Sequence, residues 1–313
     1  MTLDNKIKIA LATERCSLDD IKMKLEVTKI VKNKLQNFEK KYFDYDIVKL
    51  SQNIKYVYQF LKENDNKYAR KFIKLLNDDI FTFEKFDDNE NKLITNEPMV
   101  SKQMNDTPYS FMDIYTLKHE IYIPLYDAII DSYSILHESF HEFNKYNGTT
   151  QFSMSRTTFS EGVSIASELL FEDYLKKQNV NDYICGTYEN LNSLKYSANE
   201  AYIKLFILKL YLEKRDIKNY FTDAQLDYFN ELGFNFSADY RYILGILQAS
   251  LIDDFKLLIT MNECINNCKI EKAMNNLNLK TKIKGKTVYF DDASLSKMDE
   301  AFTKMLKRRG YSE

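Results

Sequence analysis

Near the middle of the chain stands the segment Ser134-Ile135-Leu136-His137-Glu138-Ser139-Phe140-His141-Glu142-Phe143. Two histidines four positions apart lie on the same face of an α-helix, one turn apart. Both imidazoles can then bind one metal ion, while the glutamate between them is placed to act as a general base. The chain has only 3 His, so a chance match to this motif is improbable. The alternative is a helix that carries two histidines and a solvated glutamate by chance.

Composition predicts a predominantly helical, globular protein. Among 313 residues there are only 7 Gly and 3 Pro, the two residue types that interrupt helices. With 44% hydrophobic residues the chain can form a packed core, either as one large domain or as two smaller ones. The formal net charge of -2 gives no overall positive field for binding nucleic acid or an anionic membrane.

The sequence gives no sign of a targeting or membrane segment. Its first residues lack a basic stretch followed by an apolar run, and no part approaches the ~20 apolar residues of a membrane span. We therefore expect a cytoplasmic protein, and nothing indicates its oligomeric state. The 4 Cys are too scattered for a disulfide framework, and Cys264 and Cys268 are read as thiols rather than metal ligands.

The pattern of the first hundred residues predicts a helical lobe. Apolar positions recur at helical spacing in residues 18–42 and again in residues 45–76. A polar stretch, residues 87–108, follows and includes two prolines, which suits a surface connection. We therefore predict an N-terminal helical domain of residues 1–100 and a second domain of residues 101–313 that carries the histidine pair.

Apolar and polar side chains alternate through residues 109–125, which predicts a strand directly before the histidine pair. Such a strand is a candidate edge for backbone pairing with a peptide substrate. We expect His119 in this strand to be packed or hydrogen-bonded rather than metal-bound. The histidine-bearing helix is predicted to begin near Pro124 or Leu125 and to end at Asn147-Gly148. Further on, a hairpin about Gly285 and a final helix over 291–309 are expected.

Glu161 is the candidate third ligand, because a catalytic zinc ion takes three protein ligands and keeps a fourth position open. It lies twenty positions after His141, near the start of a helix predicted over Thr158 to Lys177. Thr158-x-x-Glu161 also fits a capping box, so Glu161 has a purely structural alternative. Gly162 is costly in a helix and suggests close approach of the two helices at the metal. Glu168, two turns further on, is placed to hydrogen-bond the outer nitrogen of a ligand histidine, or else to lie on exposed surface.

Taken together, these motifs resemble the gluzincin zinc metallopeptidases, in which a glutamate on a second helix completes a His-Glu-x-x-His site. A later segment, residues 238–249, resembles the thimet oligopeptidase and oligoendopeptidase F family, where a tyrosine stabilises the oxyanion. The resemblance implies a mainly α gluzincin-like fold with a small β-sheet beside the active-site helix. It also implies that Tyr242, or as second choice Tyr240, has the oxyanion role; taken alone, either tyrosine is core packing.

The function implied is a zinc metallopeptidase with one Zn²⁺ per chain, bound by His137, His141 and Glu161. Glu138 takes a proton from the attacking water and returns it to the leaving amine. The substrates implied are oligopeptides. Two alternatives stay open: a catalytically inactive protein that uses the peptidase fold to bind a partner, and a peptidase specific for one protein target.

Overall fold

The computed structural model describes residues 2–39, 46–85, 107–112, 118–145, 154–231, 236–267, 269–284 and 287–311. The protein is mainly helical, as predicted, with two small sheets. Its helices before the first sheet are α1 (Leu3–Glu14), α2 (Leu18–Lys34), α3 (Leu50–Asn64) and α4 (Asn66–Asn77). Those after it are α5 (Ile130–Lys145), α6 (Met154–Lys177), α7 (Cys185–Leu212), α8 (Asp223–Glu231), α9 (Ser237–Ala249), α10 (Phe255–Asn266), α11 (Ile270–Asn276) and α12 (Asp292–Arg308), with the short 3-10 helix η2 (Ile217–Asn219) after α7.

The N-terminal helices are shorter than their apolar pattern predicts. Helix α2 ends at Lys34, although Leu35 and Phe38 beyond it are still buried. The helical pattern of residues 45–76 is divided between α3 and α4, because Asp65 has extended backbone angles and its side chain caps the start of α4. Helix α1, which the sequence did not suggest, buries only Ile7 and Ala10.

The larger sheet has the order β1-β3-β2, with β1 (Phe81–Lys85), β2 (Tyr109–Met112) and β3 (His119–Leu125). Strand β1 is parallel to β3, and β2 is antiparallel to it. Residues 109–125 therefore provide two strands instead of one. Because β3 is paired on both sides, it offers no free edge directly before α5; within the predicted stretch of residues 109–125 only β2 is an edge of the described sheet.

The start of α5 is set by a tight turn rather than by proline. Pro124 lies within β3 opposite Glu84, so the predicted helix start near Pro124 is wrong. The Asp131 carboxylate accepts hydrogen bonds from the backbone N–H groups of Tyr126, at 3.0 Å, and Ala128, at 3.4 Å. Asn53 of α3 donates to the Ala128 carbonyl at 2.9 Å. These bonds fix where the strand ends and the helix begins; the predicted helix end at 147–148 lies outside the described residues.

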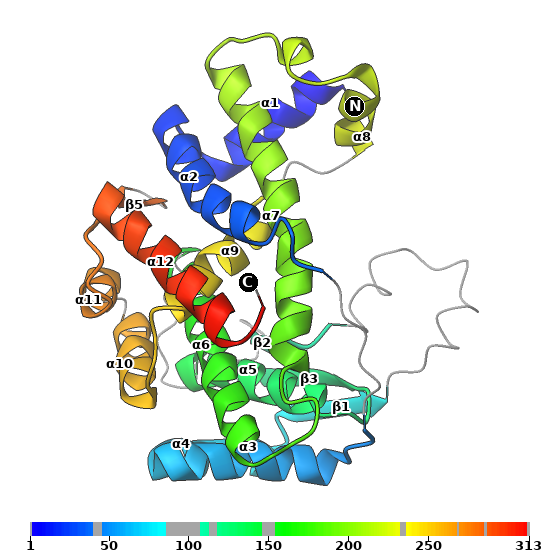
Figure 1. Ribbon diagram of the computed structural model, residues 1–313, viewed down its shortest axis with the longest axis vertical. Helices are drawn as coiled ribbons and strands as arrows, with labels where there is room; N and C mark the ends of the chain where they lie inside the picture. Colours follow the sequence, from blue (N-terminus) through cyan, green and yellow to red (C-terminus); the bar gives the residue numbers. More distant parts are fainter. Residues whose placement is uncertain are drawn as a thin grey trace.

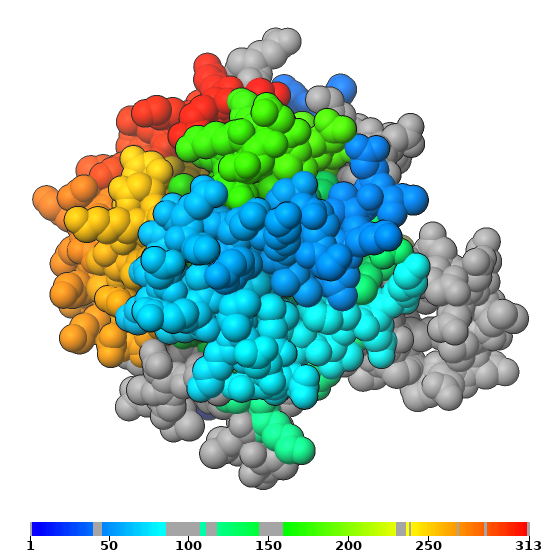
Figure 2. All heavy atoms as spheres, turned by 90° about the horizontal axis from the view of Figure 1, so that it is seen from below, coloured from blue at the N-terminus to red at the C-terminus, as the bar shows by residue number. Residues whose placement is uncertain are grey.

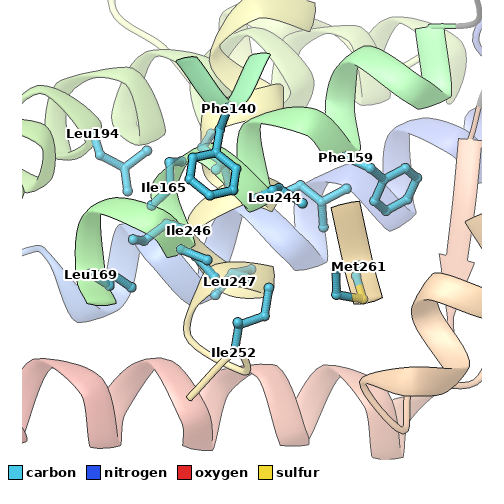
Figure 3. Packing of buried hydrophobic residues seen from close by; sticks show 14 of the residues in the cluster. Phe140, Phe159, Ile165, Leu169, Leu194, Leu244, Ile246, Leu247, Ile252 and Met261 are labelled. Carbon is cyan, nitrogen blue, oxygen red and sulfur yellow. The ribbon is translucent and has the colours of Figure 1, made fainter. Parts of the chain in front are cut away.

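The sheet and α5 lie at one end of the molecule beside α3 and α4, and the long helix α7 runs from there to α1 and α2 at the other end (Figure 1). Seen from below, α3 and α4 cross the middle of the face, with β1 beside them (Figure 2). One hydrophobic core includes residues from both sides of position 100. At its centre, side chains of α5, α6, α9 and α10 meet, including Phe140, Ile165, Leu244 and Met261 (Figure 3).

The C-terminal part follows the sequence-based expectation. Strands β4 (Thr281–Lys284) and β5 (Thr287–Phe290) pair antiparallel as the predicted hairpin, and α12 follows. The segment after α12 packs on α6. Arg309 donates to the Leu169 carbonyl at 2.7 Å and lies 3.5 Å from buried Glu172, whose carboxylate also accepts from the Tyr311 hydroxyl at 2.8 Å.

Within the described ranges, no helix has the length and apolar character needed to cross a membrane.

Candidate metal centre

Helix α5 presents its two imidazoles to one point. The Nε2 atoms of His137 and His141 lie 3.0 Å apart, as helical spacing predicts for positions i and i+4. The neighbouring Glu138 is buried, and one of its oxygens lies within 4.8 Å of a ring nitrogen of each histidine. His137, Glu138 and His141 thus form a group that can hold a metal ion.

Glu161 of α6 approaches the same point from the other side. Its Oε2 atom lies 3.6 Å from Nε2 of His137 and 3.5 Å from Nε2 of His141. This oxygen is buried and has no hydrogen-bond partner among the described residues. Leaving a carboxylate oxygen buried without a donor costs free energy, so such atoms usually have a partner. The atom is aimed at the gap between the two imidazoles.

The spacing of these three atoms fits a tetrahedral metal ion. Bonds of about 2.1 Å in tetrahedral geometry separate neighbouring ligand atoms by about 3.4 Å. The distances of 3.0, 3.5 and 3.6 Å lie on both sides of that value. Two imidazoles and one carboxylate are also a usual donor set for zinc in catalytic sites. The residues present therefore fit a zinc ion.

The capping alternative for Glu161 does not hold. Helix α6 begins at Met154, four residues before the predicted start, so Glu161 lies two turns inside the helix. A capping box requires the glutamate at the third helical position. The buried position of Glu161 within the helix therefore needs another explanation, which the histidine pair provides.

The carboxylates around the centre stabilise the protonated form of His137. Burial lowers the pKa of His137, but the carboxylates of Glu168, Glu161 and Glu138 outweigh it and raise this pKa well above its ordinary value. Burial raises the pKa of Glu161, yet the charges of His141 and His137 hold it well below the usual range. The site therefore favours a positive charge between its carboxylates.

Glu168 orients one of the histidines. Its Oε1 atom lies 2.6 Å from Nδ1 of His137, and its Oε2 atom accepts from the Asn190 side chain of α7 at 2.5 Å. A carboxylate accepts here, so Nδ1 carries a proton, and Nε2 presents its lone pair to the centre once a metal ion displaces the second ring proton. Asn190 was missed by sequence reasoning because an isolated asparagine far along the chain gives no signal.

The two candidate tyrosines of α9 point to different surroundings. Tyr240 is buried, and the Lys24 ammonium lies 5.5 Å from its ring centroid, so it belongs to the packing between α9 and α2. Tyr242 is 43% exposed, and the Glu161 charge, with burial and Glu138, raises its pKa. Of the two, only Tyr242 has a pKa raised by the carboxylates of the centre, and its phenol stays protonated.

Two glycines allow α6 and α9 to approach closely. A Cβ atom on Gly162 would meet Oε1 of Gln248 at 2.5 Å, and one on Gly245 would meet Cβ of Glu161 at 3.2 Å. Gly162 therefore faces α9, not α5, which corrects the expectation that it serves the contact between the two ligand-bearing helices. The close contact that these glycines permit brings α9, which carries Tyr242, against Glu161 of α6.

His119 lies apart from the centre's three ligand atoms, in contact with Glu142. Its Nδ1 atom pairs with the Glu142 carboxylate, which also accepts from the Ser110 hydroxyl at 3.1 Å. His119 is thus bonded within the protein, as predicted, and ties β3 to α5. Cys264 is a buried free thiol, and Cys268 lies outside the described residues.

No family model matches this chain, and comparisons with curated proteins and with solved structures find no match. The metal centre and its surroundings are therefore the basis on which function is inferred.

Proposed function

We propose that this protein is a zinc-dependent peptidase whose metal is held by His137, His141 and Glu161. The observation that carries the proposal is the buried Oε2 atom of Glu161, which lacks a hydrogen-bond donor among the described residues and lies 3.5 and 3.6 Å from the two imidazole nitrogens. A zinc ion bound there would supply a Lewis acid that polarises the scissile carbonyl and lowers the pKa of water.

The chain's own residues supply proton transfer and orientation. Glu138 takes the proton of the attacking water and delivers it to the leaving amine. Tyr242 donates a hydrogen bond to the oxygen on which negative charge develops, since its raised pKa keeps the phenol protonated. Glu168 holds His137 in the tautomer that leaves Nε2 available for the metal. Oligopeptide substrates and a gluzincin-type fold are part of the proposal and derive from the sequence resemblance.

The test begins with metal content, measured by mass spectrometry on protein purified without added metal. We expect about one zinc per chain in the native protein and much less in Glu161→Gln. The matched control is Glu271→Gln, which makes the same change at an exposed position of α11 and should keep its zinc. A native protein that holds no zinc even when zinc is supplied would refute the proposed site.

The second step tests catalysis. Glu138→Gln should keep its zinc but hydrolyse a mixed peptide library at least about 100-fold more slowly, because general-base catalysis contributes that much or more. Cleavage is followed by mass spectrometry of the products. If the variant hydrolyses peptides as fast as the native protein, Glu138 is not the general base. If neither protein cleaves any peptide, the hypothesis of an inactive binding protein is favoured.

A further inference from the structure

Arg241 places a positive charge beside the metal centre, where it forms a loose ion pair with Glu161 and no hydrogen bond to it. Its Nη1 atom lies 4.0 Å from Oε1 of Glu161, which is too far for a hydrogen bond. The described residues give its guanidinium no other acidic partner within ion-pair distance. Its side chain is 32% exposed, against 6% for Glu161. The donors of Arg241 are therefore available to a bound molecule.

Arg241 is also more exposed than the carboxylates of the centre. It precedes Tyr242 in α9, and its charge acts on the Tyr242 phenol together with the charges of Glu161 and Glu138. These two α9 side chains are partly exposed, whereas Glu138, Glu161 and Glu168 are buried. Arg241 and Tyr242 are therefore accessible to a molecule that approaches the centre from solvent.

The separation from the metal limits what Arg241 can bind. Because Oε2 of Glu161 is the ligand atom and Oε1 is the one near Arg241, Nη1 lies within about 8 Å of the metal position. An extended peptide advances about 3.5 Å per residue. The group that Arg241 binds therefore lies no more than one or two residues beyond the bond to be cleaved.

A guanidinium matches a carboxylate better than a backbone carbonyl. Its planar N–H groups donate two parallel bonds to a carboxylate, and the opposite charges strengthen both. A backbone carbonyl offers one acceptor atom and no net charge.

We infer that Arg241 binds the C-terminal carboxylate of the substrate, so that the protein removes one or two residues from the C-terminal end of peptides. The inference rests on the proposed peptidase function for its cleavage step, and it names the substrate class: peptides with a free C-terminal carboxylate. Arg241 acts as a specificity-determining residue, while Glu138 and Tyr242 serve the reacting atoms.

Binding and cleavage are tested separately. Fluorescein-labelled peptides of mixed sequence are prepared in two forms, with a free C-terminal acid and with a C-terminal amide. Their binding to zinc-loaded and to chelator-treated Glu138→Gln is followed by fluorescence anisotropy, because this variant should bind without cleaving. We expect the acid form to bind at least about tenfold more tightly than the amide in the zinc-loaded protein, and to keep a preference without metal.

Variants at Arg241 are then added to the Glu138→Gln background. Arg241→Gln should lose the preference for the acid, and Arg241→Lys should keep only part of it, because lysine keeps the charge but lacks the planar fork. The matched control is Arg70→Gln, which removes an exposed arginine of α4 and should change nothing.

The outcomes separate this inference from the proposed function. Equal binding of acid and amide, or binding of neither, overturns the inference, even if the native protein cleaves peptides internally. Selective binding of the acid that depends on Arg241 supports it, even if no cleavage is found, in which case the peptidase proposal alone fails. For an active native protein, release of single residues or dipeptides from acid but not amide peptides completes the support.

Discussion

Replacing Gly245 with alanine tests whether close packing of α9 on α6 positions Glu161, the proposed third metal ligand. The new Cβ would meet Cβ of Glu161 at 3.2 Å, the backbone nitrogen of Gly162 at 3.2 Å and Cδ1 of Ile165 at 3.1 Å. All three separations are shorter than ordinary contacts, and one involves backbone. We therefore expect α6 and α9 to move apart by a few tenths of an ångström.

We expect Gly245→Ala to lower both the free energy of unfolding and the affinity for zinc. Overpacking of this kind costs about 1–3 kcal/mol, of which alanine recovers about 1 kcal/mol through its better helix propensity. The remaining loss of up to about 2 kcal/mol is measured by urea unfolding of the metal-free protein. Because the displaced atom belongs to Glu161, zinc affinity should also fall by about tenfold, the lower end of effects seen when support around a metal ligand is disturbed. Competition with a zinc-binding dye measures it.

A second glycine provides the control. Gly310 has a positive φ of 71°, and a Cβ atom on it would meet no described atom within 4 Å, so alanine there strains the backbone without touching the centre. Gly310→Ala should lose about 1 kcal/mol of stability and keep its zinc affinity. The reasoning is refuted if Gly245→Ala binds zinc as tightly as the native protein, or if both variants lose affinity alike.

Two further predictions concern α9 and the turn before α5. Tyr242→Phe should lower kcat for peptide hydrolysis by about 100-fold, as loss of an oxyanion donor does, whereas Tyr240→Phe should leave kcat within about threefold; equal effects in steady-state kinetics would contradict this assignment. Burial raises the pKa of Asp131 to about 6, so the folded state favours its protonated form and the group adds stability as the pH falls through 6. Relative to Asp131→Asn, the native protein should therefore gain about 1.4 kcal/mol of unfolding free energy between pH 7 and pH 5, and a pH-independent difference in urea unfolding would disprove it.

Local sequence patterns were sufficient to predict several structural elements. The spacing of His137 and His141 needs only the helical period to bring their nitrogens together. The hairpin of β4 and β5 and the helix after it also depend on neighbouring residues. Helix ends were less predictable, because an apolar residue such as Phe38 continues the periodic pattern although the chain has already left the helix.

Contacts between segments that are distant in the chain could not be predicted from the sequence. The positions of Tyr240 and Tyr242 differ by about 200° around α9, so choosing between them requires knowing which face of α9 meets α6. Asn190 and Arg241 contribute to the centre only because α7 and α9 pass beside α6. For the same reason, periodicity did not show that β3 lies inside a sheet, since its partners come from separate parts of the chain.

Helix α6 carries three buried carboxylates, and each has a different set of partners. Glu161 faces the histidines of α5, Glu168 contacts both His137 of α5 and Asn190 of α7, and Glu172 lies against Arg309 after α12. A buried charge that loses its partner costs several kcal/mol. Partial release of these segments from α6 would therefore weaken the pairing of its buried carboxylates. We expect the amide hydrogens of α5, α6 and the segment after α12 to exchange with solvent together.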